Sequence, residues 1–208
     1  VYVRDLSAQR TTMLSKGTNG VAGNGGSFSP RISSDGRFVV FNSRANNLDT
    51  TVVPASIGST TQAYLLDRDV SDTGVFDTPG NTRIRLVSLN ADGLPLERGS
   101  DEVTVSLDGD YIVFSSQSPE LPGANGFRQI YARDFISTMN GITLGEVFLV
   151  SQSEAGVPGN GNSSEPVVNG GREADFGLQI AFTSDANNLI PASATFEGDT
   201  NRVPDIYL

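Results

Sequence analysis

The sequence predicts an all-β fold built from repeated units of four antiparallel strands. The chain has 23 glycines and 10 prolines in 208 residues, a composition typical of many short strands joined by tight turns. Short apolar segments bounded by turn residues recur in the same order along the chain. No stretch of useful length has the apolar spacing of an amphipathic helix.

The first recurring segment is an aromatic strand that ends in aspartate. It occurs at residues 1–5, 63–67 and 130–134, and a fourth copy begins at residues 206–208. We expect its tyrosines, together with one phenylalanine from the preceding strand of each unit, to form the core: Tyr2, Tyr64 and Tyr131, with Phe41, Phe114 and Phe182. The acids Asp5, Asp67 and Asp134 are expected to accept backbone N–H groups in the turn after each strand.

The second recurring segment is a hairpin. Asp35-Gly36 and Asp108-Gly109 each stand between alternating apolar residues, which is the strongest short-range hairpin signal. Glycine accepts the positive φ that such a turn requires. The third copy has a longer turn, from Asn169 to Gly177, and therefore carries an insertion.

These anchors divide the chain into units. Strands are expected at 27–33, 37–43, 62–68 and 83–89 in the first complete unit. The units are 1–26 (the end of a preceding blade and a linker), 27–99, 100–162, and an incomplete blade at 163–208. Four antiparallel strands per unit describe a β-propeller blade, and a blade must stack on neighbours to bury its faces. A β-sandwich is the alternative fold.

The stretch from Pro30 to Ser43, followed by the tyrosine strand, resembles the TolB-like β-propeller repeat. The resemblance covers nearly the whole chain, although Val103 replaces the leading proline in the second copy and the third copy lacks the compact Asp-Gly turn. It implies a propeller with about three blades present, of the kind found in periplasmic protein-binding modules and in propellers that gate peptidase domains. Because the chain starts at Val1 in mid-blade, we expect a section of a longer chain, or two copies that close a ring together.

Composition excludes several classes of function. The net charge of −10 disfavours nucleic acids and anionic membranes, and no apolar run approaches membrane-spanning length. The absence of histidine and cysteine removes thiol nucleophiles, disulfides, histidine-based triads and the usual zinc sites. The single lysine, Lys16, lies in a Gly/Asn-rich turn. Asp101 and Glu102 are adjacent in a strand and therefore point to opposite faces. No catalytic residue is predicted.

The candidate metal ligands are Asp199, Asn201 and Asp205. Their alternating side-chain oxygens in a turn suit Ca²⁺, which prefers several oxygen ligands. The other interpretation is a polar turn without a metal. No other cofactor is expected.

The sequence as a whole favours a non-catalytic binding or scaffold module of an exported bacterial protein, periplasmic or at the cell surface. Its partner would be a protein or a glycan, bound by the loops at one end of the ring. The first alternative is an accessory propeller that gates access to a hydrolase whose catalytic domain lies outside this chain. The second is a self-assembling structural protein that forms homo-oligomers through open blade edges.

Overall fold

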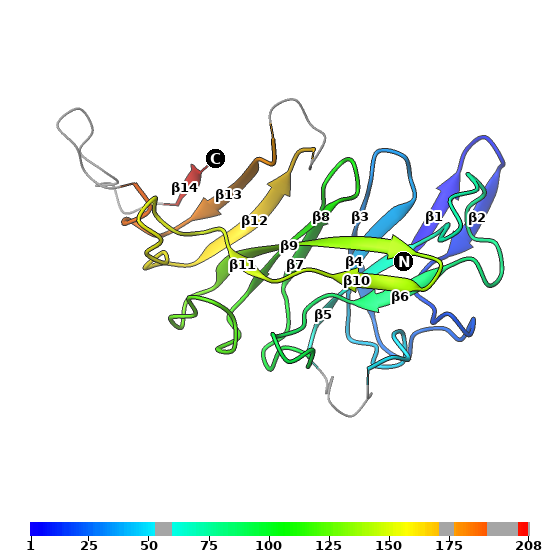
Figure 1. Cartoon of the computed structure of the whole chain (residues 1–208), viewed down its shortest axis with the longest axis horizontal. Coiled ribbons are helices and arrows are strands. Elements are labelled where there is room, and N and C mark those ends of the chain that lie inside the picture. Colours follow the sequence, from blue (N-terminus) through cyan, green and yellow to red (C-terminus); the bar gives the residue numbers. More distant parts are fainter. Residues whose placement is uncertain (53–59, 171–176, 191–203, 208) are drawn as a thin grey trace.

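The computed structural model describes residues 1–52, 60–170, 177–190 and 204–207, and these ranges contain strands and turns but no helix. Accordingly, these ranges hold no helix that could span a membrane. The strands form four antiparallel sheets that lie side by side in an open row (Figure 1). The predicted all-β class is confirmed.

The first two sheets match the repeat pattern closely. A hairpin of β1 (Tyr2–Asp5) and β2 (Arg10–Met13) begins the row. The second sheet has the strand order β3 (Ser27–Ile32), β4 (Phe38–Ser43), β5 (Gln62–Asp67) and β6 (Arg83–Leu86). Each of these four strands begins at, or one residue after, the position expected from the sequence.

The third sheet has five strands, one more than the four expected for each unit. Its strands are β7 (Glu102–Val105), β8 (Tyr111–Ser116), β9 (Gln129–Thr138), β10 (Gly141–Leu144) and β11 (Phe148–Leu149). Both β10 and β11 pair with β9, β11 at Tyr131 and Ala132 and β10 at its far end. The prediction of four strands is wrong here, because β9 runs on for 10 residues and the chain turns back at Met139-Asn140. The described part of the fourth sheet has the order β12 (Ser163–Val168), β13 (Ile180–Ser184), β14 (Asp205–Tyr207).

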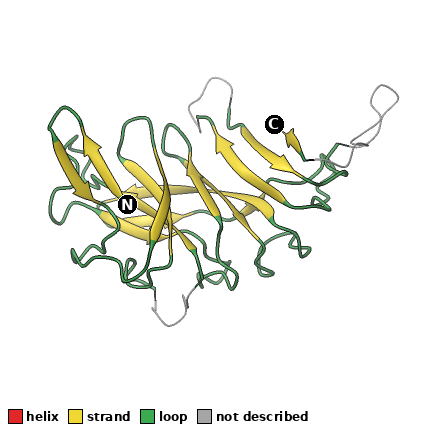
Figure 2. Cartoon of the chain, turned by 180° about the vertical axis from the view of Figure 1, so that it is seen from behind, coloured by secondary structure: helices red, strands yellow, loops and turns green. Residues whose placement is uncertain are grey.

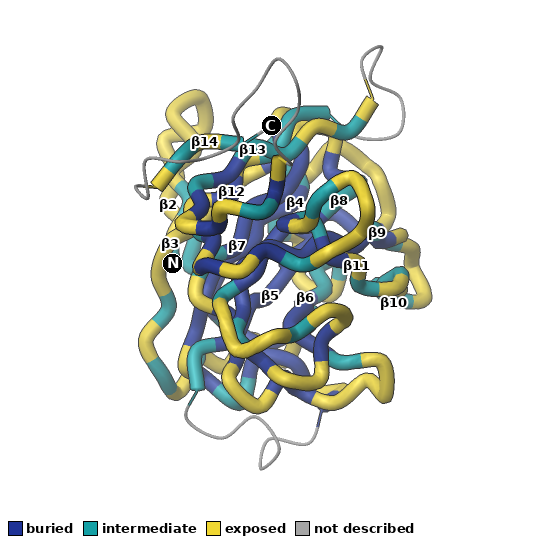
Figure 3. The backbone as a smooth tube through the Cα atoms, turned by 90° about the vertical axis from the view of Figure 1, so that its left-hand side faces the viewer, coloured by how far each residue is buried: buried dark blue, intermediate teal, exposed yellow. Residues whose placement is uncertain are grey.

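Each central strand contributes to two cores. In β4, Phe38 and Val40 pack with residues of the third sheet, whereas Phe41 packs on the side of the first hairpin. In β8, Phe114 faces the second sheet and Val113 faces the fourth. Both faces are therefore covered, which explains why these strands are apolar at successive positions rather than at alternate ones. The buried residues run along the strands inside the molecule, and the exposed ones gather in the loops (Figure 3).

The three aromatic pairs adopt nearly the same geometry. The ring centroids of Phe41 and Tyr64 are 6.0 Å apart, those of Phe114 and Tyr131 are 5.9 Å apart, and those of Phe182 and Tyr207 are 5.8 Å apart. All three pairs are stacked at interplanar angles between 21° and 29°. The repeats in the sequence are therefore repeats in conformation.

Tyr2 corrects the prediction that every repeated tyrosine is in the core. Its side chain is 66% exposed, whereas Tyr64 is fully buried. Val3 packs toward the second sheet, and adjacent strand residues point to opposite faces, so Tyr2 points away from the row. Among the described residues no further sheet covers that face.

The Asp-Gly hairpins form as predicted and also link the sheets. Gly36 and Gly109 have φ values of +79° and +78°. The backbone N–H of Ser34 donates to the carbonyl of Leu107 at 2.8 Å, and the N–H of Leu107 donates to the carbonyl of Asn169 at 3.0 Å. One turn is thus hydrogen-bonded to the next across three sheets.

At the opposite ends of the strands, the glycine-rich links clamp the Ala-Asn-Asn loops. The side-chain amide of Asn24 donates to Asn46 Oδ1 at 2.7 Å, and the backbone N–H of Asn46 donates to Asn24 Oδ1 at 3.0 Å. Asn160 and Asn187 form the same two hydrogen bonds, also at 2.7 and 3.0 Å. A side chain on Gly25 would place its Cβ 2.5 Å from the backbone carbon of Arg44. The close approach of the two backbones therefore requires glycine.

We expect Gly25→Ala to lower the free energy of unfolding by about 2 kcal/mol or more, because backbone atoms must move to admit the methyl group. Gly26→Ala is the matched control, since its Cβ would meet nothing within 4 Å. Urea denaturation of both variants checks the difference. Equal losses in the two variants would contradict the close-approach explanation.

We expect Tyr64→Phe to lower the free energy of unfolding by about 1–3 kcal/mol, because the buried tyrosine hydroxyl donates to the carbonyl of Ala45 at 2.7 Å. Tyr2→Phe removes the same hydroxyl from an exposed ring and should leave stability almost unchanged. Thermal unfolding followed by circular dichroism compares the two.

Candidate functional site

The β9–β10 hairpin extends across the outer strand of the second sheet (Figures 1 and 2). Ile142, Leu144 and Val147 pack on the core that the second and third sheets share. The hydroxyl of Ser137 in this hairpin donates to Asp67 Oδ2 at 2.6 Å. Apolar packing and this hydrogen bond hold the hairpin against the second sheet.

Asp67 is itself held in place by hydrogen bonds within the second sheet. Its carboxylate is fully buried and receives two hydrogen bonds of 3.0 Å from the Arg37 guanidinium. The backbone N–H of Asp69 donates to it at 2.8 Å. The hydrogen bonds to Asp67 raise the pKa of Arg37 above its usual value, so the arginine remains charged.

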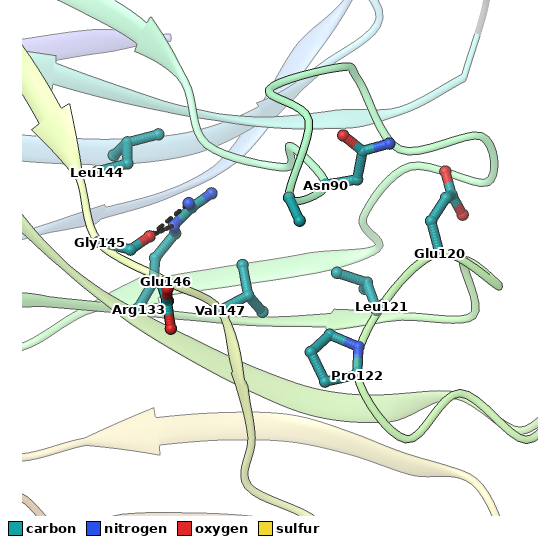
Figure 4. Close-up of a pocket in the computed structure, with 10 residues that line it drawn as sticks. Asn90, Glu120, Leu121, Pro122, Arg133, Leu144, Gly145, Glu146 and Val147 are labelled. Carbon is teal, nitrogen blue, oxygen red and sulfur yellow. Dashed lines mark hydrogen bonds between the residues drawn. The ribbon is translucent and has the colours of Figure 1, made fainter.

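Two adjoining cavities lie beside the hairpin. One, of about 550 Å³, is shown in Figure 4 and lies among the end of β10, the loop after β6 and the loop after β8. The other, of about 380 Å³, lies between β6, the loop after it and β10. Both are lined by the same four residues, Asn90, Ala91, Arg133 and Leu144. Because they share these residues, the two adjoining cavities are together called here the hairpin groove.

Arg133 lies at the centre of the hairpin groove. Its side chain projects from β9, and the residue is only 6% exposed. Its guanidinium donates to the backbone carbonyls of Val87 at 2.9 Å and of Gly145 at 3.0 and 2.5 Å. Burial and the nearby Arg85 lower the pKa of Arg133 to about 10, and the charge of Asp134 opposes this in part. No carboxylate in the described residues forms an ion pair with it.

The walls of the hairpin groove are chemically divided. Arg85 and Arg133 line the smaller cavity. In the larger cavity Leu121, Pro122 and Val147 supply apolar surface, and Glu120 and Glu146 supply negative charge (Figure 4). The groove thus combines cationic, apolar and acidic regions, an arrangement suited to holding a ligand in one orientation. Among its lining residues no serine, cysteine or lysine offers a nucleophile.

The predicted calcium ligands are only partly within the described residues. Asp199 and Asn201 lie outside them. Asp205 begins β14, where its backbone pairs opposite Ser184. Within the described ranges no group of three acidic side chains comes together. The proposed Ca²⁺ site therefore stays a prediction.

The strand-end acids differ from one unit to the next. Asp5 accepts backbone N–H groups from Ser7 and Ala8 at 2.8 Å each, as predicted, and the bond from Ala8 lowers its pKa. Asp67 accepts a backbone N–H and also forms the buried ion pair. At Asp134 the backbone carbonyl accepts the N–H of Gly145 at 2.9 Å.

The remaining candidate groups are separated by the fold. Asp101 pairs with Arg128 at 3.2 Å, whereas Glu102 accepts the backbone N–H of Glu165 at 2.9 Å. They engage different neighbours, as their adjacent strand positions predict. Lys16 lines a separate cavity of about 320 Å³ together with Asp77, whose carboxylate is bound by a buried arginine.

Sequence reasoning missed both the hairpin and Arg133. Asn140-Gly141 was the available signal for the hairpin, and Gly141, with φ +136°, begins β10 directly after the turn at Met139-Asn140. For Arg133 the signal was a cation within the otherwise apolar strand Ile130-Tyr131-Ala132. A charge in a buried strand needs a partner or a function.

No family model and no curated protein matches this chain. The chemistry of the hairpin groove therefore rests on its own residues. Its central feature is a buried guanidinium whose hydrogen-bond acceptors are all neutral carbonyl groups.

We expect Asp67→Asn to lower the free energy of unfolding by about 3 kcal/mol, because it leaves the Arg37 guanidinium without its buried counter-ion. Asp72→Asn is the matched control, since Asp72 binds the same arginine at 3.0 Å but its side chain is 84% exposed. Urea denaturation should show little change in that control. Equal stability of the two variants would mean that the buried pair does not anchor the hairpin.

Proposed function

We propose that the sheets of this chain are consecutive blades of a β-propeller. The support is that neighbouring sheets share apolar cores, with the same aromatic pair in each repeat. The first strands of successive units, β3, β7 and β12, also contact one another in turn. Four-stranded sheets that stack in this manner are the building principle of propellers. The resemblance to TolB-like repeats favours the same fold.

We further propose that the chain acts as a non-catalytic binding module, with the hairpin groove as its binding site. The single observation that carries this proposal is that the β9–β10 hairpin, added to a repeated scaffold, creates a groove around a buried cation. In the second sheet the equivalent connection, residues 68–82 between β5 and β6, forms turns and adds no strands. Insertions positioned by a rigid scaffold commonly carry function.

The partner we propose is a protein or a glycan, and the location is the periplasm or the cell surface. The family resemblance supports this location. The absence of histidine and cysteine from the sequence supports binding over nucleophilic catalysis. The loops after β6 and β8, which line the groove, lie at the end of the sheets opposite the Asp-Gly turns (Figure 1). This placement agrees with recognition by loops at one end.

Screening the purified chain on arrays of peptides and glycans tests the proposed function. Ala91 is exposed and lines both cavities, so Ala91→Trp should fill the groove and weaken binding about tenfold or more. Ala155→Trp is the matched control, because Ala155 is exposed in the corresponding turn of the next unit and lines neither groove cavity. Array ligands whose affinity both substitutions leave unchanged would contradict binding in the groove.

A further inference from the structure

We propose that the smaller cavity of the hairpin groove binds a carboxylate group carried by a peptide partner. This inference rests on the proposed function and names the chemistry of the ligand at the same site. Three features carry it: the balance of charge, the unused hydrogen-bond donors, and the composition of the adjoining cavity.

The smaller cavity carries an excess of positive charge. Arg85 and Arg133 both line it. The carboxylate that neutralises part of this charge is Asp49, whose Oδ2 lies 3.3 Å from Arg85. That oxygen also accepts the backbone N–H of Leu86 at 2.8 Å. Arg85, Arg133 and Asp49 together carry one net positive charge, and the acids Glu120 and Glu146 line the adjoining cavity. An anion bound here would relieve the cost of the buried arginine.

The cavity also has hydrogen-bond donors left for a ligand. Four of the five N–H groups of Arg133 are taken by the carbonyls of Val87, Leu89 and Gly145, which leaves one on Nη2. The contact with Leu89, at 3.5 Å, is long enough to yield to a better acceptor. The Arg85 side chain, which is 27% exposed, also lines the cavity. A carboxylate bound there can accept charge-assisted hydrogen bonds from guanidinium groups.

The adjoining cavity orients the ligand. Glu120 and Glu146 line it, so a bound carboxylate is favoured on the side of the two arginines, away from these acids. Leu121, Pro122 and Val147 offer apolar surface next to the charged end. An acidic residue flanked by leucines fits this division better than a sugar acid, whose hydroxyl groups would lose water against apolar walls.

Titration of the chain with short synthetic peptides tests the inference. Binding is measured by isothermal titration calorimetry and by changes in NMR chemical shifts. The first peptide has one central aspartate between leucines and is blocked at both ends. The second has asparagine in its place, and the third is neutral in its side chains but has a free C-terminal carboxylate. We expect binding of the first or the third and about tenfold weaker binding of the second. Inorganic phosphate and glucuronic acid serve as the competing anions.

Two pairs of variants locate the binding. Thr143 is exposed and lines the smaller cavity, so Thr143→Glu should repel the carboxylate and weaken binding about tenfold without disturbing the core. Thr138→Glu adds the same charge to an exposed position on the same hairpin, outside both cavities. Arg85→Gln should weaken binding similarly, whereas Arg83→Gln on the same strand should not. NMR spectra of each variant confirm that it is folded.

The outcomes separate this inference from the proposed function. Equal affinity for the aspartate and asparagine peptides overturns the carboxylate inference, and so do unchanged affinities in Thr143→Glu and Arg85→Gln. Tighter binding of phosphate or of glucuronic acid than of either carboxylate peptide overturns it as well. The proposed function fails on a different result, namely array ligands whose binding Ala91→Trp leaves unaffected.

Discussion

The stacking of each sheet on its neighbours is the constraint on which the rest of the structure depends. A sheet with two apolar faces cannot be stable alone, so the buried residues of β4 and β8 are divided between two cores. The stacked rings of Phe41–Tyr64 and Phe114–Tyr131 lie in these cores, and the hydrogen bond from Ser34 to Leu107 joins neighbouring sheets at one end. Exposed loops lie at the ends of the strands (Figure 3).

The hairpin groove lies where the third sheet departs from the repeat pattern. The residue two positions after the repeated tyrosine differs between the sheets and shows the effect of this departure. It is Arg4 in the first hairpin, where the guanidinium is exposed and donates to Gln9 and Thr11. It is the buried, apolar Leu66 in the second sheet. In the third sheet it is Arg133, which the β9–β10 hairpin and its return to β11 cover. The β9–β10 hairpin thus buries Arg133, whereas the equivalent Arg4 of the first hairpin is exposed.

The β9–β10 hairpin also gives Asp67, one of the repeated strand-end acids, a second role. Asp5 and Asp67 occupy equivalent strand ends, and each accepts a backbone N–H. Asp67 also receives Arg37 and the hydroxyl of Ser137 from the next sheet, so a residue that shapes a turn also positions the hairpin. The geometry of the hairpin groove therefore depends on a buried ion pair within the second sheet.

The sequence by itself determined the all-β class, the four strands of the second sheet and the Asp-Gly turns, because these follow from local patterns that repeat. Gly36 and Gly109, for example, need only their immediate neighbours to form a turn. Only the tertiary structure decided that Tyr2 is exposed while Tyr64 is buried, since burial depends on which sheet covers each face. It also decided the hairpin groove, where Arg85 from β6 meets Arg133 and Leu144 from the β9–β10 hairpin. Such a juxtaposition arises from long-range packing, which leaves no local pattern in the residues that it brings together.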